Sequence, residues 1–438
     1  MSRVTEFFRP RTAAAIVIAN MIGTGVFTSL GFQLLEIQSG FVLLMLWAVG
    51  GVAALCGALS YAELGAALPR SGGEYNFLTE IYHPIAGFIS GWVSATVGFA
   101  APTALAALTF GSYLSSVFPS LSPLWLATGL VTGLTAVHCT SHAGSGGTQS
   151  FFTALKLILI MGFSVLALYL MDVPQPVSFV PVAGDGALLL SGSFAVSLIY
   201  VNYAYSGWNA ATYISSELEQ PQRHLPPVLI ISTSIVALSY LLLNYVFLSV
   251  APMDKMAGQI EIGYVAAQSV MGPVGATVMG TLLSLLLIST VSAMVMAAPR
   301  VLQAIGRDFP AFRELGVRNR HGLPTRAILL QSSISLLFLW TSSFESILIF
   351  SGATMALNTF FTVLGLFILR RTQPDLPRPY KTWLYPLPPL LFLGLTGWTL
   401  VYTVMQRPLE GLMTLGIIVS GAVFYWLSKW IGRIRHGL

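Results

Sequence analysis

The sequence is short of charge and of cysteine, and each shortage argues against a class of protein. Charged residues make up 8% of the 438 residues, whereas a soluble domain has about 25%. The two cysteines, Cys56 and Cys139, fall within or at the end of apolar runs, which is not the pattern of a disulfide framework. The apolar runs also lack the converging His, Asp or Glu residues that an enzyme would need at membrane depth. We therefore expect no enzyme, no catalytic residue and no cofactor.

Long apolar runs are what the chain has in place of charge. Hydrophobic residues make up 55% of the sequence. Runs of about 20 residues, the length that crosses a bilayer as a helix, occur twelve times. Their centres lie near residues 24, 53, 100, 130, 160, 203, 238, 287, 333, 357, 393 and 420. The pattern predicts an all-α membrane protein with 12 transmembrane helices.

The positive charges are distributed unevenly between the segments that join these runs. If the N-terminus is cytoplasmic, eighteen of the 21 Lys and Arg residues lie in inner segments, and only Lys255 and Arg407 lie in outer loops. An excess of Lys and Arg on the cytoplasmic side is the usual determinant of orientation. The net charge of +5 then reflects topology, and we expect no nucleic-acid partner. The prediction is a multi-pass protein of the plasma (inner) membrane with both termini cytoplasmic.

The first apolar run is interrupted near its middle by Gly23, Thr24 and Gly25. Glycine destabilises a helix because it loses the most backbone freedom on ordering. Within a bilayer a broken helix is tolerated only where its unpaired backbone groups line a cavity or meet a ligand. Free carbonyls would end the first half-helix and free N–H groups would begin the second. These groups complement the ammonium and the carboxylate of an amino acid.

A second apolar run, at 187–216, is interrupted in the same way by the segment Tyr203–Asn209. A packing kink would explain this segment if it stood alone. Paired interruptions in corresponding spans of two halves, however, point to the binding site of a transporter. The interrupted spans are the first and the sixth, which implies a five-plus-five inverted repeat. We expect one polytopic domain over 1–438, with repeats at 11–171 and 187–371 and two accessory helices at 381–438 that serve packing or homo-oligomer contacts.

Four segments resemble a known family of membrane proteins. They are the Gly-Thr-Gly-Val-Phe element of the first span and the segments 60–75, 203–226 and 375–381. Together they resemble the amino acid–polyamine–organocation superfamily, especially its L-amino-acid transporter branch. The resemblance runs from about residue 11 to residue 386 and implies a LeuT-type fold with broken helices 1 and 6. Taken alone, 60–75 is also a helix end with a Gly-rich turn, in which Glu63 and Glu74 are solvated or paired with Arg70.

The resemblance implies that backbone groups of the first interruption bind the substrate. The N–H groups of Thr24 and Gly25, beside Gly23, would hold the carboxylate, and the Thr24 hydroxyl would assist. A carbonyl of Met21 or Ile22 would accept from the ammonium. Peptide dipoles recognise both charges without a buried counter-ion, whose desolvation would be costly.

The second interruption contributes three further residues by the same resemblance. Carbonyls of Tyr203 and Ser206 would also meet the ammonium, and the Tyr203 ring would close an outer gate. Ser206 stands where the branch commonly has glycine, which narrows the pocket and favours small or medium neutral amino acids. Asn209 would couple substrate binding to movement. No acidic residue maps to the pocket, which argues against cationic substrates.

Lys156 is the only Lys or Arg inside a predicted span. A lysine near the end of a span can extend its ammonium to the headgroups. The alternative is a functional charge that faces the interior, since an isolated ammonium at this depth is costly. By resemblance, Lys156 occupies the place of a bound cation in sodium-driven relatives. This implies sodium-independent transport, by exchange or by proton coupling.

Two further features concern partners and metals. In animal relatives, a cysteine in the loop at 118–123 ties the transporter to a heavy-chain subunit. This loop has no cysteine, so we expect no such subunit. His138 and His142 would share a helix face, which could suggest a metal site. We favour a capped helix end there and expect no metal.

These features predict a secondary active transporter of amino acids that works by alternating access. The first alternative is a polyamine or organocation carrier on the same fold, which would need a carboxylate near the site. The second is a channel, which should show a charged or carbonyl-lined pore motif, or a polytopic membrane enzyme. The expected partners are an amino acid substrate and the lipid bilayer.

Overall fold

The structure, a computed structural model, describes residues 9–140, 146–309, 312–319 and 322–436. Over these residues the chain forms helices joined by turns and loops, and no strand is present among them. The helices of the first part are α1 (Pro10–Met21), α2 (Gly25–Gln33), α3 (Gly40–Ala67), α4 (Glu74–Ile81), α5 (Pro84–Val93), the π-helical turn η1 (Ser94–Gly98), α6 (Ala100–Val117), α7 (Pro123–Thr140) and α8 (Gly146–Leu170).

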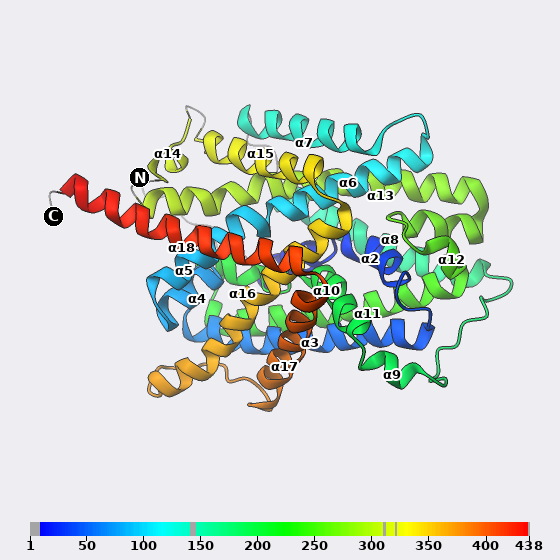
Figure 1. Cartoon of the computed structure of the whole chain (residues 1–438), viewed down its shortest axis with the longest axis horizontal. Helices are drawn as coiled ribbons and strands as arrows, with labels where there is room; N and C mark the ends of the chain where they lie inside the picture. The colour runs from blue at the N-terminus through cyan, green and yellow to red at the C-terminus, as the bar shows by residue number, and fades with distance from the viewer. Residues whose placement is uncertain (1–8, 141–145, 310–311, 320–321, 437–438) are drawn as a thin grey trace.

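The second part of the chain continues the same architecture. Its elements are α9 (Asp185–Leu189), α10 (Gly192–Tyr205), the 3-10 helix η2 (Ala210–Glu217), α11 (Pro221–Val250), α12 (Met253–Met256), α13 (Ile262–Asp308), α14 (Arg313–Gly316), α15 (Thr325–Thr341), α16 (Phe344–Thr372), α17 (Leu387–Gln406) and α18 (Pro408–His436). Figure 1 shows α4, α5 and the far end of α18 at one end of the molecule, and α9 and α12 towards the other.

Most of the predicted spans have the length and composition of membrane helices. Among the described residues, nine helical segments are long and apolar enough to cross a membrane. The runs centred near 130, 203 and 333 form the helices α7, α10 and α15, of 18, 14 and 17 residues. These three helices are not among the nine segments. The helices fit a helical membrane protein, while the count of twelve spans stays a prediction.

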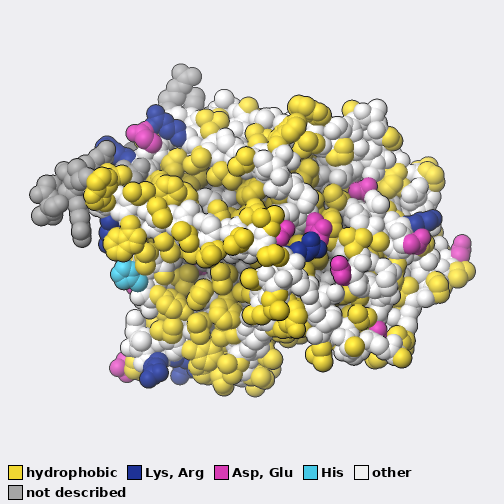
Figure 2. Space-filling view, viewed as in Figure 1, with side chains coloured by type: hydrophobic (Ala, Val, Ile, Leu, Met, Phe, Trp, Pro, Cys, Tyr) yellow, Lys and Arg dark blue, Asp and Glu magenta, His cyan; other side chains and the backbone are white. Residues whose placement is uncertain are grey.

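The exterior of the molecule matches a bilayer environment. Figure 2 shows a mainly hydrophobic face with charged side chains near its two ends and in one cluster between them. Large apolar side chains are exposed along the helices, such as Leu238 at 69% and Trp430 at 62%. A soluble protein rarely exposes contiguous apolar surface on this scale.

Local sequence signals account for several helix boundaries. The hydroxyls of Ser39, Ser191 and Ser343 accept hydrogen bonds from backbone N–H groups at the starts of α3, α10 and α16. A serine in this position satisfies one of the N–H groups that a helix start leaves unpaired. Pro84 and Pro221 occupy the first turns of α5 and α11, where their missing N–H is not needed.

Glu63 corrects one of the alternatives drawn from the sequence. Its side chain is fully buried and does not pair with Arg70. It accepts two hydrogen bonds from the Arg370 guanidinium, at 2.8 and 2.7 Å, and a third from the Thr382 backbone N–H at 2.7 Å. The Arg378 guanidinium lies 3.6 Å away. The carboxylate therefore joins α3 to the end of α16 and to the loop that follows it.

Candidate functional site

Both predicted interruptions are present in the structure. The first helix ends at Met21, and a new helix begins at Gly25 after a non-helical Ile22. The second, α10, ends at Tyr205, and the chain resumes as η2 only at Ala210. In both places local sequence explains the break, since glycine and serine support a helix poorly.

The two interruptions lie directly against each other. A Cβ atom added to Gly25 would lie 2.4 Å from the Ala204 Cα, and one added to Gly207 would lie 2.8 Å from the Asn20 carbonyl carbon. Gly207 also has φ of +99°, a conformation that side-chain-bearing residues rarely adopt. The glycines thus permit a close approach of two backbones that are about 180 residues apart in sequence.

A cavity of about 1310 Å³ lies beside this contact. Eight of the nine residues singled out from the sequence line it: Met21, Gly23, Thr24, Gly25, Lys156, Tyr203, Ser206 and Asn209. The ninth, Ile22, is fully buried beside the cavity. The structure therefore brings the predicted residues together, but it contains no ligand that would reveal their roles.

The cavity is lined from both halves of α8 and α13, so it is not confined to one end of the molecule. Phe152 and Leu166 on α8 line it, and so do Met271 and Ala297 on α13. Thr12 at the start of α1 and Glu217 at the end of η2 line it at the end that holds α4. Away from this end, the ring of Phe32 stacks on Phe344 with centroids 5.4 Å apart, and on Tyr200 at 6.0 Å. Tyr200 also donates to Glu345 at 2.8 Å.

Lys156 faces the interior and does not extend to the surface. Its side chain is 5% exposed. Its ammonium donates to the Ile22 carbonyl at 2.8 Å and to the Thr290 hydroxyl on α13 at 3.0 Å. The lysine therefore connects α8 to the first interruption and to α13. Thr290 was not singled out from the sequence.

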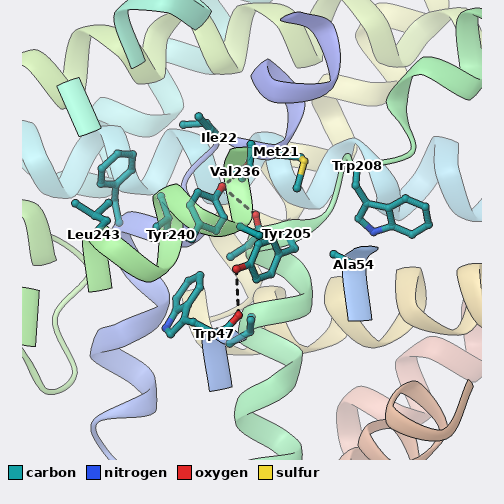
Figure 3. Close-up of a cluster of buried hydrophobic side chains, with 14 of the residues drawn as sticks. Met21, Ile22, Trp47, Ala54, Tyr205, Trp208, Val236, Tyr240 and Leu243 are labelled. Atoms are coloured by element: carbon teal, nitrogen blue, oxygen red, sulfur yellow. Dashed lines mark hydrogen bonds between the residues drawn. The ribbon is translucent and has the colours of Figure 1, made fainter. Parts of the chain in front are cut away.

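Tyr240 on α11 contacts both interrupted helices with one hydroxyl. That hydroxyl lies 2.6 Å from the Met21 carbonyl oxygen and 3.2 Å from the Ala204 carbonyl oxygen. Figure 3 shows Tyr240 beside Met21 and Tyr205. Tyr205 packs beside it and donates to the Trp47 carbonyl at 3.1 Å. Sequence reasoning missed Tyr240 because the seventh apolar run, centred near residue 238, looked uniformly apolar. A tyrosine in such a run has a polar tip that needs a partner, and this was the available signal.

Several of the predicted ammonium acceptors already accept hydrogen bonds. The Met21 carbonyl accepts from the Gly23 N–H at 2.8 Å as well as from Tyr240. The Tyr203 carbonyl accepts from the Ser206 N–H at 3.0 Å. A carbonyl oxygen has two lone pairs, so the Met21 oxygen has none left for a substrate in this arrangement.

The expectation of a pocket without acidic residues is wrong, because Glu74 and Glu217 line the cavity. Glu217 is exposed, whereas Glu74 is 1% exposed. Glu74 is not solvated or paired with Arg70; it accepts hydrogen bonds from the side chains of Tyr61, Asn209 and Tyr213. Linear sequence put Glu74 in a turn, and only the folding of that turn under η2 brings it to the cavity.

His138 takes part in helix packing. Its Nε2 lies 2.9 Å from the Ser292 hydroxyl of α13. Its predicted partner, His142, lies outside the described residues. Over the rest of the chain that the structure describes, no group of three or more His, Cys, Asp or Glu could hold a metal ion.

Comparison with known proteins identifies the family. The sequence profile of a family described as "Amino acid permease" matches residues 8–423. The large neutral amino acids transporter small subunit 2 of Mus musculus is 28% identical over 430 residues, which cover 95% of this chain and 80% of the relative. The b(0,+)-type amino acid transporter 1 of Homo sapiens is 27% identical over 423 residues, which cover 94% of this chain and 86% of the relative.

The profile match covers nearly the whole chain, including both interrupted helices and the cavity between them. The relatives are transporters, and the apolar helices are those of a multi-pass membrane protein. The chain belongs to the amino acid permease family of membrane transporters, within the amino acid–polyamine–organocation superfamily.

Proposed function

We propose that this chain is a secondary active transporter that carries small or medium neutral L-amino acids across the plasma membrane by alternating access. The observation that carries the proposal is the contact between the two interrupted helices at the edge of one cavity. Backbone groups released at both breaks are available to a zwitterion there.

The proposed architecture is a LeuT-type five-plus-five inverted repeat, with repeats at 11–171 and 187–371 and accessory helices at 381–438. The breaks in the first and sixth predicted spans support this arrangement. The twelve predicted spans and the excess of inner Lys and Arg support a topology with both termini in the cytoplasm.

For the substrate backbone, we assign the carboxylate to the N–H groups of Thr24 and Gly25. They stand at the start of α2, where N–H groups have no partner within the helix and the dipole is positive. We assign the ammonium to the carbonyls of Ile22, Tyr203 and Ser206. Met21 is the weaker choice because its oxygen already accepts from Tyr240 and Gly23.

Lys156 would make transport independent of sodium. Its ammonium holds the Ile22 carbonyl and the Thr290 hydroxyl together, which is the task of a bound cation. A substrate ammonium at Ile22 would repel Lys156, so the two charges are coupled. Lys156→Ala should therefore change transport kinetics or ion dependence. Unchanged behaviour in proteoliposomes would remove Lys156 from the mechanism.

The preference for small or medium substrates rests on Ser206, whose side chain takes space that glycine would leave. Glu74 supports the polyamine or organocation alternative, because it puts a carboxylate on the cavity wall. Its oxygens, however, already accept from three neutral donors. Competition by spermidine, arginine and alanine against a labelled neutral amino acid separates the two functions.

We propose that the chain works without a disulfide-linked heavy subunit. The loop at 118–123 has no cysteine, and both cysteines are free. One relative is named a small subunit, so the proposal needs a direct test. Transport by the purified chain alone would support it, and transport that requires a co-purified protein would contradict it.

The decisive experiment is a thermal-shift screen of the twenty amino acids, followed by counterflow in proteoliposomes with and without sodium or a pH gradient. Stabilisation by small neutral amino acids and sodium-independent counterflow are expected. Absence of counterflow with all twenty would contradict the proposed function.

A further inference from the structure

We propose that Glu74 is a positioning residue that holds the second interruption, through Asn209 and Tyr213, in the form that binds substrate. The inference rests on the proposed function and adds to it a residue outside both interruptions. Glu74 is the first residue of α4, and its neighbours come from three other parts of the chain.

The first step is the burial of a carboxylate without a cationic partner. Glu74 is 1% exposed, and the ion pairs of the described residues do not include it. A buried carboxylate is costly unless hydrogen bonds satisfy its oxygens. Three side-chain donors supply such hydrogen bonds to Glu74.

The second step is the origin of these hydrogen bonds. The Tyr61 hydroxyl on α3 donates at 2.9 Å, the Asn209 amide donates from the second interruption, and the Tyr213 hydroxyl donates from η2. All three donors are neutral. Two of them, Asn209 and Tyr213, belong to the segment that follows α10. Most of the hydrogen bonds that Glu74 accepts therefore come from the broken helix.

The third step is the backbone contact around this carboxylate. The Gly73 N–H donates to the Thr212 carbonyl at 3.3 Å. The backbone N–H groups of Ser71 and Ser216 each donate to the other serine's hydroxyl, both at 2.9 Å. Gly73 has φ of +54°, and a Cβ there would lie 2.9 Å from the Tyr213 ring. The turn before α4 is therefore fitted against η2.

The consequence concerns substrate affinity. The same interruption carries Ser206 and Asn209 on the cavity wall. If Asn209 and Tyr213 lose their shared acceptor, this segment can relax away from the first interruption. Substrate binding then has to restore the binding form of this segment. The apparent affinity therefore falls in proportion to the fraction of molecules that already have this form.

The test uses the purified full chain in proteoliposomes and measures KM and kcat of counterflow with radiolabelled L-alanine, L-serine and L-leucine. Glu74→Gln replaces one acceptor oxygen of the carboxylate by an amide NH₂ group, which donates. This group would face the three donors Tyr61, Asn209 and Tyr213. The variant should raise KM about tenfold, the effect of losing one charge-assisted hydrogen bond. Glu80→Gln is the matched control, because Glu80 is an exposed carboxylate on the same helix. Its KM should equal that of the parent.

Tyr213→Phe removes one hydroxyl that donates to Glu74. This variant tests the same inference if Glu74→Gln does not fold. It should raise KM in the same direction, and the double variant should show less than the sum of the two effects. Parental KM in Glu74→Gln or in Tyr213→Phe, or a change in kcat alone, would overturn the inference. Failure of the parent chain to show counterflow would instead count against the proposed function.

Discussion

Glu63 and Glu74 are two buried carboxylates eleven residues apart in sequence, and their surroundings differ in kind. Glu63 meets two arginines and a backbone N–H, far from the cavity lining. Glu74 meets only neutral donors and lines the cavity. A carboxylate held by guanidinium groups is a fixed connection between helices. One held by side chains of a broken helix positions that helix.

The largest expected effect follows removal of the fixed connection. Glu63→Ala leaves the Arg370 and Arg378 guanidinium groups in a partly buried site without their acceptor. We expect a loss of about 3 kcal/mol in the free energy of unfolding, since breaking a buried pair from one side is costly. A melting curve in detergent measures it. Arg407→Ala, which breaks the more exposed pair with Glu345 and leaves that carboxylate its hydrogen bond from Tyr200, should cost less than about 1 kcal/mol. Equal losses would refute the distinction.

A second prediction tests the contact between the turn and η2. Gly73→Ala puts a Cβ against the Tyr213 ring at a positive φ. It should cost about 1–2 kcal/mol and raise the KM of counterflow. Gly72→Ala shares the positive φ, but its Cβ would come no closer than 3.6 Å to any neighbour. This variant should lose stability with little change in KM. The contact has no role in binding if both variants change KM alike.

A third prediction concerns the hydroxyl that lies between the two interrupted helices. Tyr240→Phe removes the bond to Met21 and leaves that carbonyl with a free lone pair. We expect a loss of about 1 kcal/mol in stability and a change in KM. Tyr205→Phe, which removes a hydroxyl directed at the Trp47 carbonyl, should cost similar stability and change KM less, because its bond does not occupy a predicted ammonium acceptor. A parental KM in Tyr240→Phe would contradict this role.

The smallest effect is expected at the donor that does not belong to the broken helix. Tyr61→Phe removes one of three bonds to Glu74 and keeps the ring packing against Phe77 and Trp208. Stability should fall by about 1 kcal/mol or less, and KM should rise less than in Tyr213→Phe. A larger rise in KM than in Tyr213→Phe would place the sensitive contact on α3 and not on η2.

Sequence by itself determined the helical membrane class and the two interruptions. Both follow from local properties: long apolar runs must form helices in a bilayer, and Gly23, Gly25, Ser206 and Gly207 weaken a helix wherever they stand. These signals need no knowledge of distant partners. They also led to nine site residues, eight of which line the cavity.

Only the tertiary structure decided which charged and polar groups meet. Glu63 pairs with arginines more than 300 residues away, and Glu74 meets Asn209 across 135 positions. The Tyr240 hydroxyl reaches Met21 across 219 positions. Such contacts depend on how whole helices pack, and an isolated sequence offers several partners of equal chemistry. For that reason the pairing with Arg70 and the pocket without acidic residues were wrong, while the breaks themselves were predicted in the right places.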